Sequence, residues 1–293
     1  MLLLALLACQ DYRISKQPDV ETVVDTADTA PPEDTAPPED TAPPVDTVDT
    51  AQPGTDETGW PDTAPPEDTS PPEDTSPPDP EIAVEPVYIN SGDTLYSFDP
   101  KTQAIEPIGN FTDGSTAIEN MTDIAIDLSG RMYGITHEAL WRINPLSAAA
   151  SHIADLGEDV YLDSLTFVSD GRLIAAGSGE VWLMDDSSAQ LTNLSFTTEY
   201  SSAGDIVGLP DGMLYWSVWG AGLMVVNPSD GSNRYLGSTE HDRIFGLGYA
   251  YGDLWAFSDE GYALVLNTST GAPEESYAIG TGWWGATTNP VLW

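Results

Sequence analysis

Carboxylates and aromatic rings are the side chains of this sequence best suited to binding chemistry. They recur where turn-forming residues meet short apolar runs, which are the points where loops join strands. Carboxylates accept hydrogen bonds from sugar hydroxyls and aromatic rings stack on the apolar faces of sugars, whereas clustered carboxylates suit calcium. The residues that we predict at such a ligand site are Asp123, Asp163, Asp205, His241, Trp283 and Trp284.

Asp123 and Asp205 stand at equivalent strand starts, and two further roles are open to them. A pair of carboxylates at a suitable separation performs acid and base catalysis in glycosidases, and Asp163 is another candidate for that role. Alternatively, an Asp at such a strand start accepts hydrogen bonds from backbone N–H groups and is structural. Trp283 and Trp284 alternate across one strand, so we expect one to pack and the other to face the site.

No local motif identifies an enzyme. The sequence lacks a nucleophile elbow, a phosphate-binding loop and a cysteine pair. The histidines lack metal-ligand spacing, and we expect them at the surface; they are His137, His152 and His241. The sequence therefore assigns no catalytic residue and implies no cofactor, with a bound calcium ion left open.

A repeat positions these residues. Three segments open alike, and their turn glycines Gly130, Gly171 and Gly212 lie 41 residues apart; the segments read DIAIDLSGRMYGI, SLTFVSDGRLIAA and DIVGLPDGMLYWS. A fourth copy, GLGYAYGDLWAF, begins at Gly246. A second series of short apolar runs follows at similar spacing and reads LYSFDP, LWRINP, VWLMDD, LMVVNP and ALVLNT. Four short strands in one such repeat match the size of a propeller blade.

The number of copies predicts how the ring closes. The second series has five copies, but only four copies of the first series precede them, so blade 1 (87–108) lacks its inner strand. The segment 285–293 aligns with 246–255 and supplies that strand, which removes an exposed sheet edge. We therefore predict an all-β fold, a five-bladed β-propeller over residues 87–293, with its first blade closed by the C-terminal strand and Trp293 in the core. Recurrent aromatics in the second and third strands should pack between blades; they are Tyr133, Trp141, Trp182, Tyr215 and Trp255.

The segment from Asp123 to Pro145, which carries DIAID followed by LWRINP, resembles the broad superfamily of bacterial propeller-repeat proteins (YVTN/quinoprotein-like). This resemblance extends over residues 87–293 and implies the fold. It does not imply a function, because propellers serve as enzymes, lectins and scaffolds. Kelch, WD-repeat and pyrroloquinoline-quinone signatures are not evident.

Propellers usually bind ligands at the face where their inner strands enter. The predicted loops of this face are 112–122, 157–163, 197–204, 239–244 and 280–284, together with hairpins near Trp219 and Tyr262. The loops are short for shaping a substrate cleft. We therefore expect a binding or scaffold module with a glycan or surface-protein ligand, and a carbohydrate-active hydrolase is the alternative.

The N-terminus is typical of an export signal. Residues 1–8 read MLLLALLA, an apolar run too short to span a bilayer. The residues Leu6 to Cys9 resemble a bacterial lipobox, which implies cleavage before Cys9 and lipidation of that residue. Gln10 rather than Asp follows the cysteine, so the resemblance favours the outer membrane over the inner one.

Residues 9–86 are predicted to form a disordered acidic stalk. Residues 10–86 contain 21 Asp and Glu against two basic residues, and paired prolines recur in DTAPPE and DTSPPE hexapeptides. Such a composition buries too little apolar surface to fold, and paired prolines favour extended polyproline II. The segment would therefore space the domain away from a membrane. A less favoured role is that of ligand for a proline-binding module.

The net charge of −40 limits the partners. Like charges repel nucleic acid, so nucleic acid is an unsuitable partner, and the membrane contact is expected through the lipid at Cys9 alone. Cys9 is the single cysteine, so the chain forms no internal disulfide. We expect a monomer.

Overall fold

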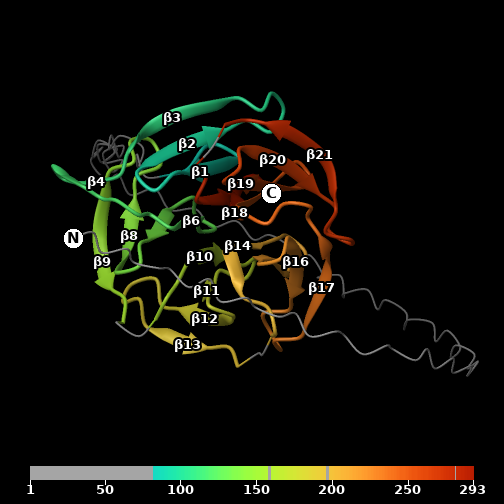
Figure 1. Cartoon of the computed structure of the whole chain (residues 1–293). Helices are drawn as coiled ribbons and strands as arrows, with labels where there is room; N and C mark the ends of the chain where they lie inside the picture. Colours follow the sequence, from blue (N-terminus) through green and yellow to red (C-terminus); the bar gives the residue numbers. More distant parts are fainter. Residues whose placement is uncertain (1–81, 158–159, 196–197, 281) are drawn as a thin grey trace, which may run out of the picture. The chain divides into compact units, whose positions relative to one another are not determined.

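The computed structural model describes residues 82–157, 160–195, 198–280 and 282–293. These residues form five four-stranded antiparallel sheets arranged as blades around a central channel (Figure 1). The predicted five-bladed all-β propeller is therefore confirmed. The predicted signal peptide, Cys9 and the stalk up to residue 81 lie outside the described residues.

The strands of each blade are named in their order within the sheet, from the channel to the outer edge. Blade 1 contains β22 (Gly285–Thr288), β1 (Val87–Asn90), β2 (Thr94–Phe98) and β3 (Ile105–Asn110). Blade 2 contains β6 (Asp123–Ile126), β7 (Met132–Ile135), β8 (Ala139–Ile143) and β9 (Ala150–Asp155). Blade 3 contains β10 (Ser164–Phe167), β11 (Leu173–Gly177), β12 (Glu180–Met184) and β13 (Leu191–Asn193).

The two remaining blades follow the same order. Blade 4 contains β14 (Ser202–Gly208), β15 (Leu214–Val218), β16 (Gly222–Val226) and β17 (Asn233–Ser238). Blade 5 contains β18 (Ile244–Ala250), β19 (Asp253–Ser258), β20 (Tyr262–Leu266) and β21 (Pro273–Ala278). An additional hairpin of β4 (Thr112–Asp113) and β5 (Thr116–Ala117) extends the loop between blades 1 and 2.

The C-terminal strand closes the ring as the repeat count predicts. Strand β22 pairs antiparallel with β1, with Val87 opposite Thr288 and Asn90 opposite Gly285. It also lies between β18 and β6, the inner strands of blades 5 and 2. The five inner strands therefore run side by side around the channel, and no inner strand is left as an exposed edge.

Trp293 departs from the sequence prediction. The chain leaves β22 after Thr288 and forms a short 3-10 helix, η1 (Pro290–Leu292), so Trp293 is 38% exposed instead of lying in the core. The physical reason lies at Asn289 and Pro290. Proline has no N–H for a sheet ladder, and the Asn289 side chain accepts the Val291 N–H at 3.2 Å, which turns the chain into the helix.

The recurrent aromatics pack between blades. Tyr133 of β7 lies against Phe167 of β10 with ring centroids 5.3 Å apart, and Phe98 of β2 meets Trp255 of β19 edge-on at 5.1 Å. Buried apolar clusters of this kind join each blade to the next, so the core is a ring of interblade layers rather than one central mass.

The turn glycines lie at the C-terminal ends of the inner strands, and the described chain starts at the same face of the propeller. Gly130, one of the predicted turn glycines, has φ of 81°, a left-handed conformation that suits glycine. Ile82 bridges Arg131 next to this turn, and the N–H of Ala83 donates to the carbonyl of Gly130 at 2.7 Å. Residues 82–86 thus pack on the propeller ahead of the predicted boundary at residue 87. Within the described ranges, no helix is long and apolar enough to cross a bilayer.

Candidate functional site

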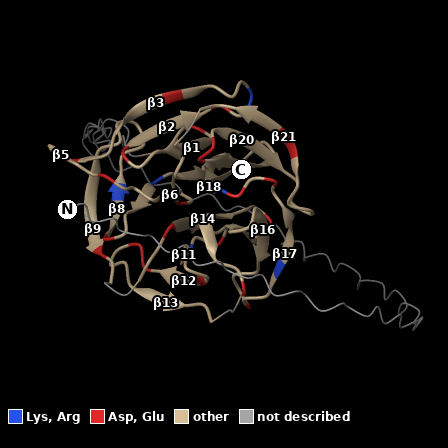
Figure 2. Ribbon diagram, viewed as in Figure 1, with Lys and Arg blue, Asp and Glu red and all other residues tan. Residues whose placement is uncertain are grey.

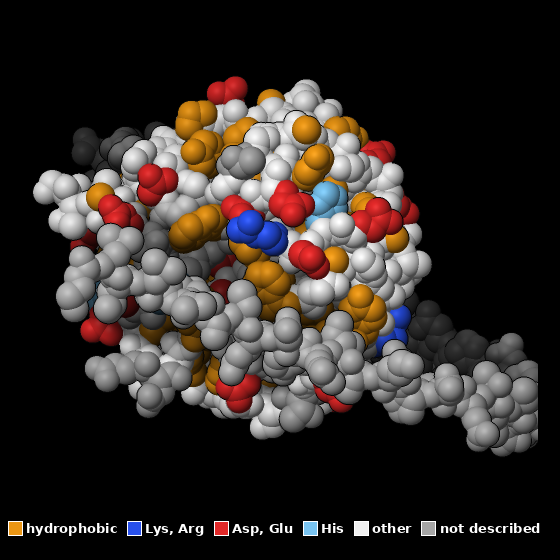
Figure 3. Space-filling model, viewed as in Figure 1, with side chains coloured by type: hydrophobic (Ala, Val, Ile, Leu, Met, Phe, Trp, Pro, Cys, Tyr) orange, Lys and Arg blue, Asp and Glu red, His pale blue; other side chains and the backbone are white. Residues whose placement is uncertain are grey.

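A cavity of about 510 Å³ opens where the inner strands enter the propeller. Figure 3 shows this face hollowed near its centre, with hydrophobic side chains beside the hollow. The lining includes five rings, which belong to His137, Tyr161, Trp219, Phe245 and Trp284. It also includes short polar side chains, which belong to Thr122, Asp163, Ser178, Ser201 and Ser202. We call this space the mouth cavity.

The repeat supplies the lining from corresponding positions of different blades. One series lies at or just before the inner strands, at Thr122, Asp163, Gly204, Phe245 and Trp284; the first four are spaced by 41 residues. A second series lies in the hairpins between second and third strands, at His137, Ser178 and Trp219, again 41 residues apart. A symmetric backbone thus presents different side chains around one opening, and both rings and hydroxyl groups are among them.

Three of the lining rings are open to solvent. Tyr161, Trp219 and Trp284 are 54%, 52% and 37% exposed. His137 stacks on Tyr161 with ring centroids 4.6 Å apart and an interplanar angle of 24°. Trp219 stands edge-on to Phe245 at 6.1 Å. These rings are therefore held by neighbours while part of their surface stays free for a ligand.

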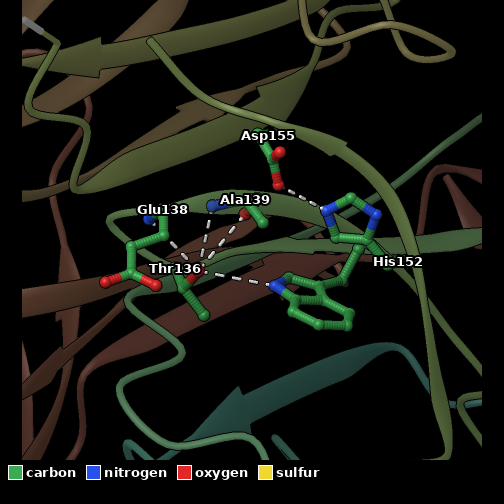
Figure 4. A network of polar contacts seen from close by, with 6 residues as sticks. Thr136, Glu138, Ala139, His152 and Asp155 are labelled. Atoms are coloured by element: carbon green, nitrogen blue, oxygen red, sulfur yellow. Dashed lines mark hydrogen bonds and ion pairs between the residues drawn. The ribbon is translucent and has the colours of Figure 1, made fainter. Parts of the chain in front are cut away.

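The hairpin that carries His137 is fixed by Thr136 (Figure 4). The Thr136 hydroxyl oxygen accepts the N–H groups of Glu138 at 3.3 Å and Ala139 at 3.1 Å, and the Trp141 indole N–H at 3.4 Å. These bonds satisfy backbone groups of the tight turn and hold the hairpin at the rim of the mouth cavity.

Figure 4 also shows His152, which lies on the outer strand of the same blade. Its Nε2 lies 2.8 Å from Asp155 Oδ1, and its ring meets Trp141 edge-on at 5.3 Å. His152 is partly exposed and does not line the mouth cavity, in agreement with the predicted surface position.

Asp163 is the carboxylate of the mouth cavity. Its Oδ1 accepts the hydroxyls of Ser202 at 2.7 Å and Ser164 at 2.9 Å. Burial raises the pKa of the Asp163 carboxyl, while the hydrogen bonds from these serines and the nearby His137 oppose the rise. Both serine bonds reach the same oxygen, Oδ1.

Asp123 and Asp205 lie beneath the mouth cavity and have no exposed surface. The Asp123 carboxyl accepts the N–H of Leu165 at 2.6 Å and of Ile124 at 2.8 Å, and the Asp205 carboxyl accepts the N–H of Leu247. Each aspartate thereby ties its blade to the inner strand of the next blade. The structural role that the sequence left open, the acceptance of backbone donors, is the one observed.

The two buried carboxyls also face each other. Burial raises the pKa of Asp123 well above its ordinary value, and repulsion from Asp205 raises it further; burial likewise raises the pKa of Asp205. A buried pair of neighbouring carboxyls disfavours the doubly ionised state, so the pair holds a proton to higher pH than a free Asp does. Asp205 Oδ1 is buried and has no hydrogen-bond partner among the described residues.

Trp283 and His241 lie outside the lining. Trp283 is 6% exposed, meets Tyr96 edge-on at 5.3 Å and donates its indole N–H to the carbonyl of Gly280 at 3.0 Å. Trp284, the next residue, lines the cavity, so one tryptophan packs and the other faces the mouth, although both precede β22 and do not alternate across a strand. His241 Nδ1 lies 3.3 Å from Glu260 Oε2, away from the cavity.

Of the six predicted site residues, the structure thus brings Asp163 and Trp284 together at the mouth. His137 was expected only at the surface, yet it lines the cavity. Its spacing of 41 residues from Ser178 and of 82 from Trp219 is the signal that identifies it.

Charge around the mouth is mostly negative. Figure 2 shows acidic residues distributed over the blades and few basic ones. Among the described residues that line the cavity, none is Lys or Arg. Arg243 stands beside it, with its guanidinium carbon 5.6 Å from the Phe245 ring, and pairs with Asp259. In the part of the chain that the structure describes, no three His, Cys, Asp or Glu side chains are grouped as a metal site.

No family model and no curated protein matches the chain. Among solved structures, it is similar to a chain of a nidogen/laminin complex (TM-score 0.49, 13% identity, 71% of this chain and 98% of that one). It is also similar to a protein of unknown function from Bacteroides caccae (TM-score 0.43, 10% identity, 66% and 73%). A third similarity is to the symmetrical protein of "The de novo evolutionary emergence of a symmetrical protein is shaped by folding constraints" (TM-score 0.48, 15% identity, 71% and 96%). These similarities assign no ligand, and membership of the YVTN/quinoprotein-like superfamily stays a prediction.

Proposed function

We propose that this protein is a non-catalytic binding module of the bacterial cell envelope whose mouth cavity takes a saccharide. A propeller is a fold suited to binding or scaffolding. The observation that supports a saccharide ligand is the lining of the cavity, which combines exposed rings, one carboxylate and several hydroxyls. Rings stack on the apolar face of a sugar, while carboxylate and hydroxyl groups exchange hydrogen bonds with its hydroxyls.

The carboxylates support binding rather than hydrolysis. Glycoside hydrolysis uses two carboxyl groups that flank the scissile bond. Asp163 is the one carboxylate among the described lining residues, and Asp123 and Asp205 have no exposed surface for a substrate to touch. The alternative of a hydrolase at the channel therefore has no observation in its favour.

The entry point of the chain supports display on a stalk. Ile82 lies at the turn end of the inner strands, and the mouth cavity lies at their opposite end. If residues 9–81 are a spacer lipidated at Cys9, the spacer joins the propeller at the face opposite the cavity. The lipid would hold the protein at a membrane, with the outer membrane favoured. Wild-type protein is expected in the membrane fraction and the Cys9→Ser variant in the soluble fraction. If both proteins fractionate alike, the proposal of a lipid anchor at Cys9 is wrong.

The saccharide proposal is tested by binding of full-length Cys9→Ser protein to a panel of glycans and polysaccharides, with calcium and with a chelator. We expect saturable binding that Trp284→Ala weakens about tenfold, equivalent to about 1.4 kcal/mol. Trp293→Ala is a matched control, because Trp284 and Trp293 are 37% and 38% exposed but lie at opposite ends of β22. Loss of binding with the chelator would show that the carboxylates hold calcium.

Two results would contradict the proposal. Equal losses in Trp284→Ala and Trp293→Ala would place the ligand elsewhere. A well-folded protein that binds no member of the panel would exclude the saccharide, and the same variants would then be compared in pull-downs for a surface-protein partner.

A further inference from the structure

A second hollow lies on the face opposite the mouth, where the described chain begins. It has a volume of about 570 Å³, and its walls include Pro86, Pro210, Tyr249, Tyr251, Leu292 and Trp293. We call it the stalk-side groove. Tyr251 is 63% exposed, Leu292 53% and Trp293 38%. Large exposed rings that gather around one hollow are characteristic of a surface that binds a partner.

The groove is pre-formed. The Trp293 indole N–H donates to the Thr288 hydroxyl at 3.2 Å, and that hydroxyl donates to the carbonyl of Tyr249. This relay fixes the indole against the end of blade 5. A ring that is held in place loses little rotamer entropy when a ligand packs on it. The rings therefore form walls with a fixed spacing.

One cation stands beside these rings. Lys101 Nζ lies 4.3 Å from the centroid of the Tyr251 ring, and the lining of the groove among the described residues contains no Asp or Glu. A groove of aromatic and proline rings next to an ammonium group suits an apolar segment that also carries acidic side chains. Aromatic grooves of this kind recognise polyproline II helices, which are rigid before binding and so lose little entropy.

The sequence places such a segment directly before the described chain. Residues 70–80 read SPPEDTSPPDP, with prolines at 71, 72, 77, 78 and 80 and acids at 73, 74 and 79. Ile82 lies on the same face as the groove, and Pro86 is part of its wall. Ten residues of polyproline II extend about 31 Å, more than the roughly 15 Å width of one four-stranded blade. The segment is therefore long enough to fold back onto the groove.

We propose that the acidic proline-rich segment 70–80 docks in the stalk-side groove of its own chain, with proline rings against Tyr251 and Trp293 and acidic side chains near Lys101. The last part of the stalk then has a fixed course on the propeller. This sets the direction in which the domain projects from its tether. The inference does not depend on the ligand of the mouth cavity.

The test places a nitroxide spin label at Thr75→Cys in the full-length Cys9→Ser protein and records the indole N–H signals of its tryptophans. The Trp293 signal is assigned with Trp293→Phe. Docking predicts that this signal is broadened to well under half of its unlabelled intensity, while the Trp219 signal at the mouth is preserved. Tyr251→Ala with Lys101→Gln should restore the Trp293 signal, and Tyr262→Ala, which removes an exposed tyrosine of the mouth face, should not.

Three outcomes would overturn the inference. Equal intensities for Trp293 and Trp219 would show that the segment does not visit the groove. Broadening that persists when prolines 71, 72, 77 and 78 are replaced by serine would show proximity through the tether alone. Broadening that disappears on tenfold dilution would show that the segment belongs to a second copy of the chain.

Discussion

The carboxyl groups of Asp123 and Asp205 are both fully buried, and the charge of Asp205 raises the pKa of Asp123, although the two residues belong to blades 2 and 4 and lie 82 positions apart in the sequence. Blade 3 lies between them and contributes Ser164 at the corresponding position. Each aspartate extends beyond its own blade, to the N–H of Leu165 or of Leu247. The interaction of the two carboxyls is thus a by-product of two identical interblade ties that meet at the centre of a small ring.

The pair makes stability depend on pH with a defined sign. Burial raises the pKa of both carboxyls in the folded protein above the value in the unfolded chain, which is about 3.9 for Asp. The folded state therefore binds protons on this pair more tightly than the unfolded chain does. The stabilising contribution of this protonation is complete below about pH 4 and is lost as the pH rises through the folded-state pKa.

Asp205→Asn is predicted to reduce this loss. An amide at this position keeps an oxygen for the Leu247 N–H and carries no proton that is lost as the pH rises. Relative to wild type, the variant should gain free energy of unfolding as the pH rises from about 4 to about 8. Denaturant unfolding of both proteins across this range measures the difference.

Asp123→Asn is the matched control and should behave differently. Both oxygens of Asp123 accept backbone N–H groups, from Ile124 and Leu165, so an NH₂ on either side faces a donor. We expect a loss of about 1–3 kcal/mol already near pH 4, where wild type and Asp205→Asn should be similar in stability. Parallel stability curves for wild type and Asp205→Asn from about pH 4 to about pH 8 would contradict the raised pKa of the pair.

Gly285→Ala is predicted to destabilise the ring at its closure. A Cβ at Gly285 would lie 2.5 Å from Asp123 Oδ1 and 2.6 Å from Asn90 Oδ1, and both side chains are fully buried. The clash should reduce the free energy of unfolding by about 1–3 kcal/mol. Gly157→Ala is the control, because the one contact of its Cβ within 4 Å among the described residues would be Val160 at 3.9 Å. If Gly285→Ala lowers the free energy of unfolding no more than Gly157→Ala does, the side chains around Gly285 can move to accommodate the added Cβ.

The repeat was sufficient to predict the fold, because the numbers of copies in its two series show which strand closes the ring. Five apolar runs and four preceding strand pairs leave one inner strand to find, and GATTNPVLW matches the fourth copy at its first residues. The match also placed Trp293 in the core, where Trp255 lies in blade 5. It failed there because Pro290 ends the ladder, a local effect that the repeat alignment does not include.

The site was harder to predict, because whether a side chain meets a ligand depends on how deep in the channel it lies. Strand starts in this fold carry Asp163 at the rim and Asp123 one layer below, only one register position apart in the repeat. Alternation does not say which of these positions meets solvent. His137 was missed for a different reason: its importance comes from the ring of Tyr161 beside it, 24 residues away in sequence.

Ser202→Ala is predicted to shift the pH dependence of ligand binding at the mouth. The Ser202 hydroxyl donates to Asp163 Oδ1 at 2.7 Å, and this bond lowers a pKa that burial raises. Its removal should raise the pKa of Asp163. If the ionised carboxylate binds the saccharide, the acidic midpoint of the affinity profile moves to higher pH, and affinity near neutral pH changes little.

Ser201→Ala is the control for this shift, because Ser201 also lines the cavity but contributes its backbone carbonyl, not its side chain, to the Trp219 N–H. Affinity profiles for wild type and both variants, measured from about pH 4 to about pH 8, span the ordinary Asp value and the range above it. An unchanged midpoint in Ser202→Ala would mean that Asp163 does not contact the ligand. An equal shift in both variants would mean that the hydroxyls act through the shape of the cavity rather than through the charge of Asp163.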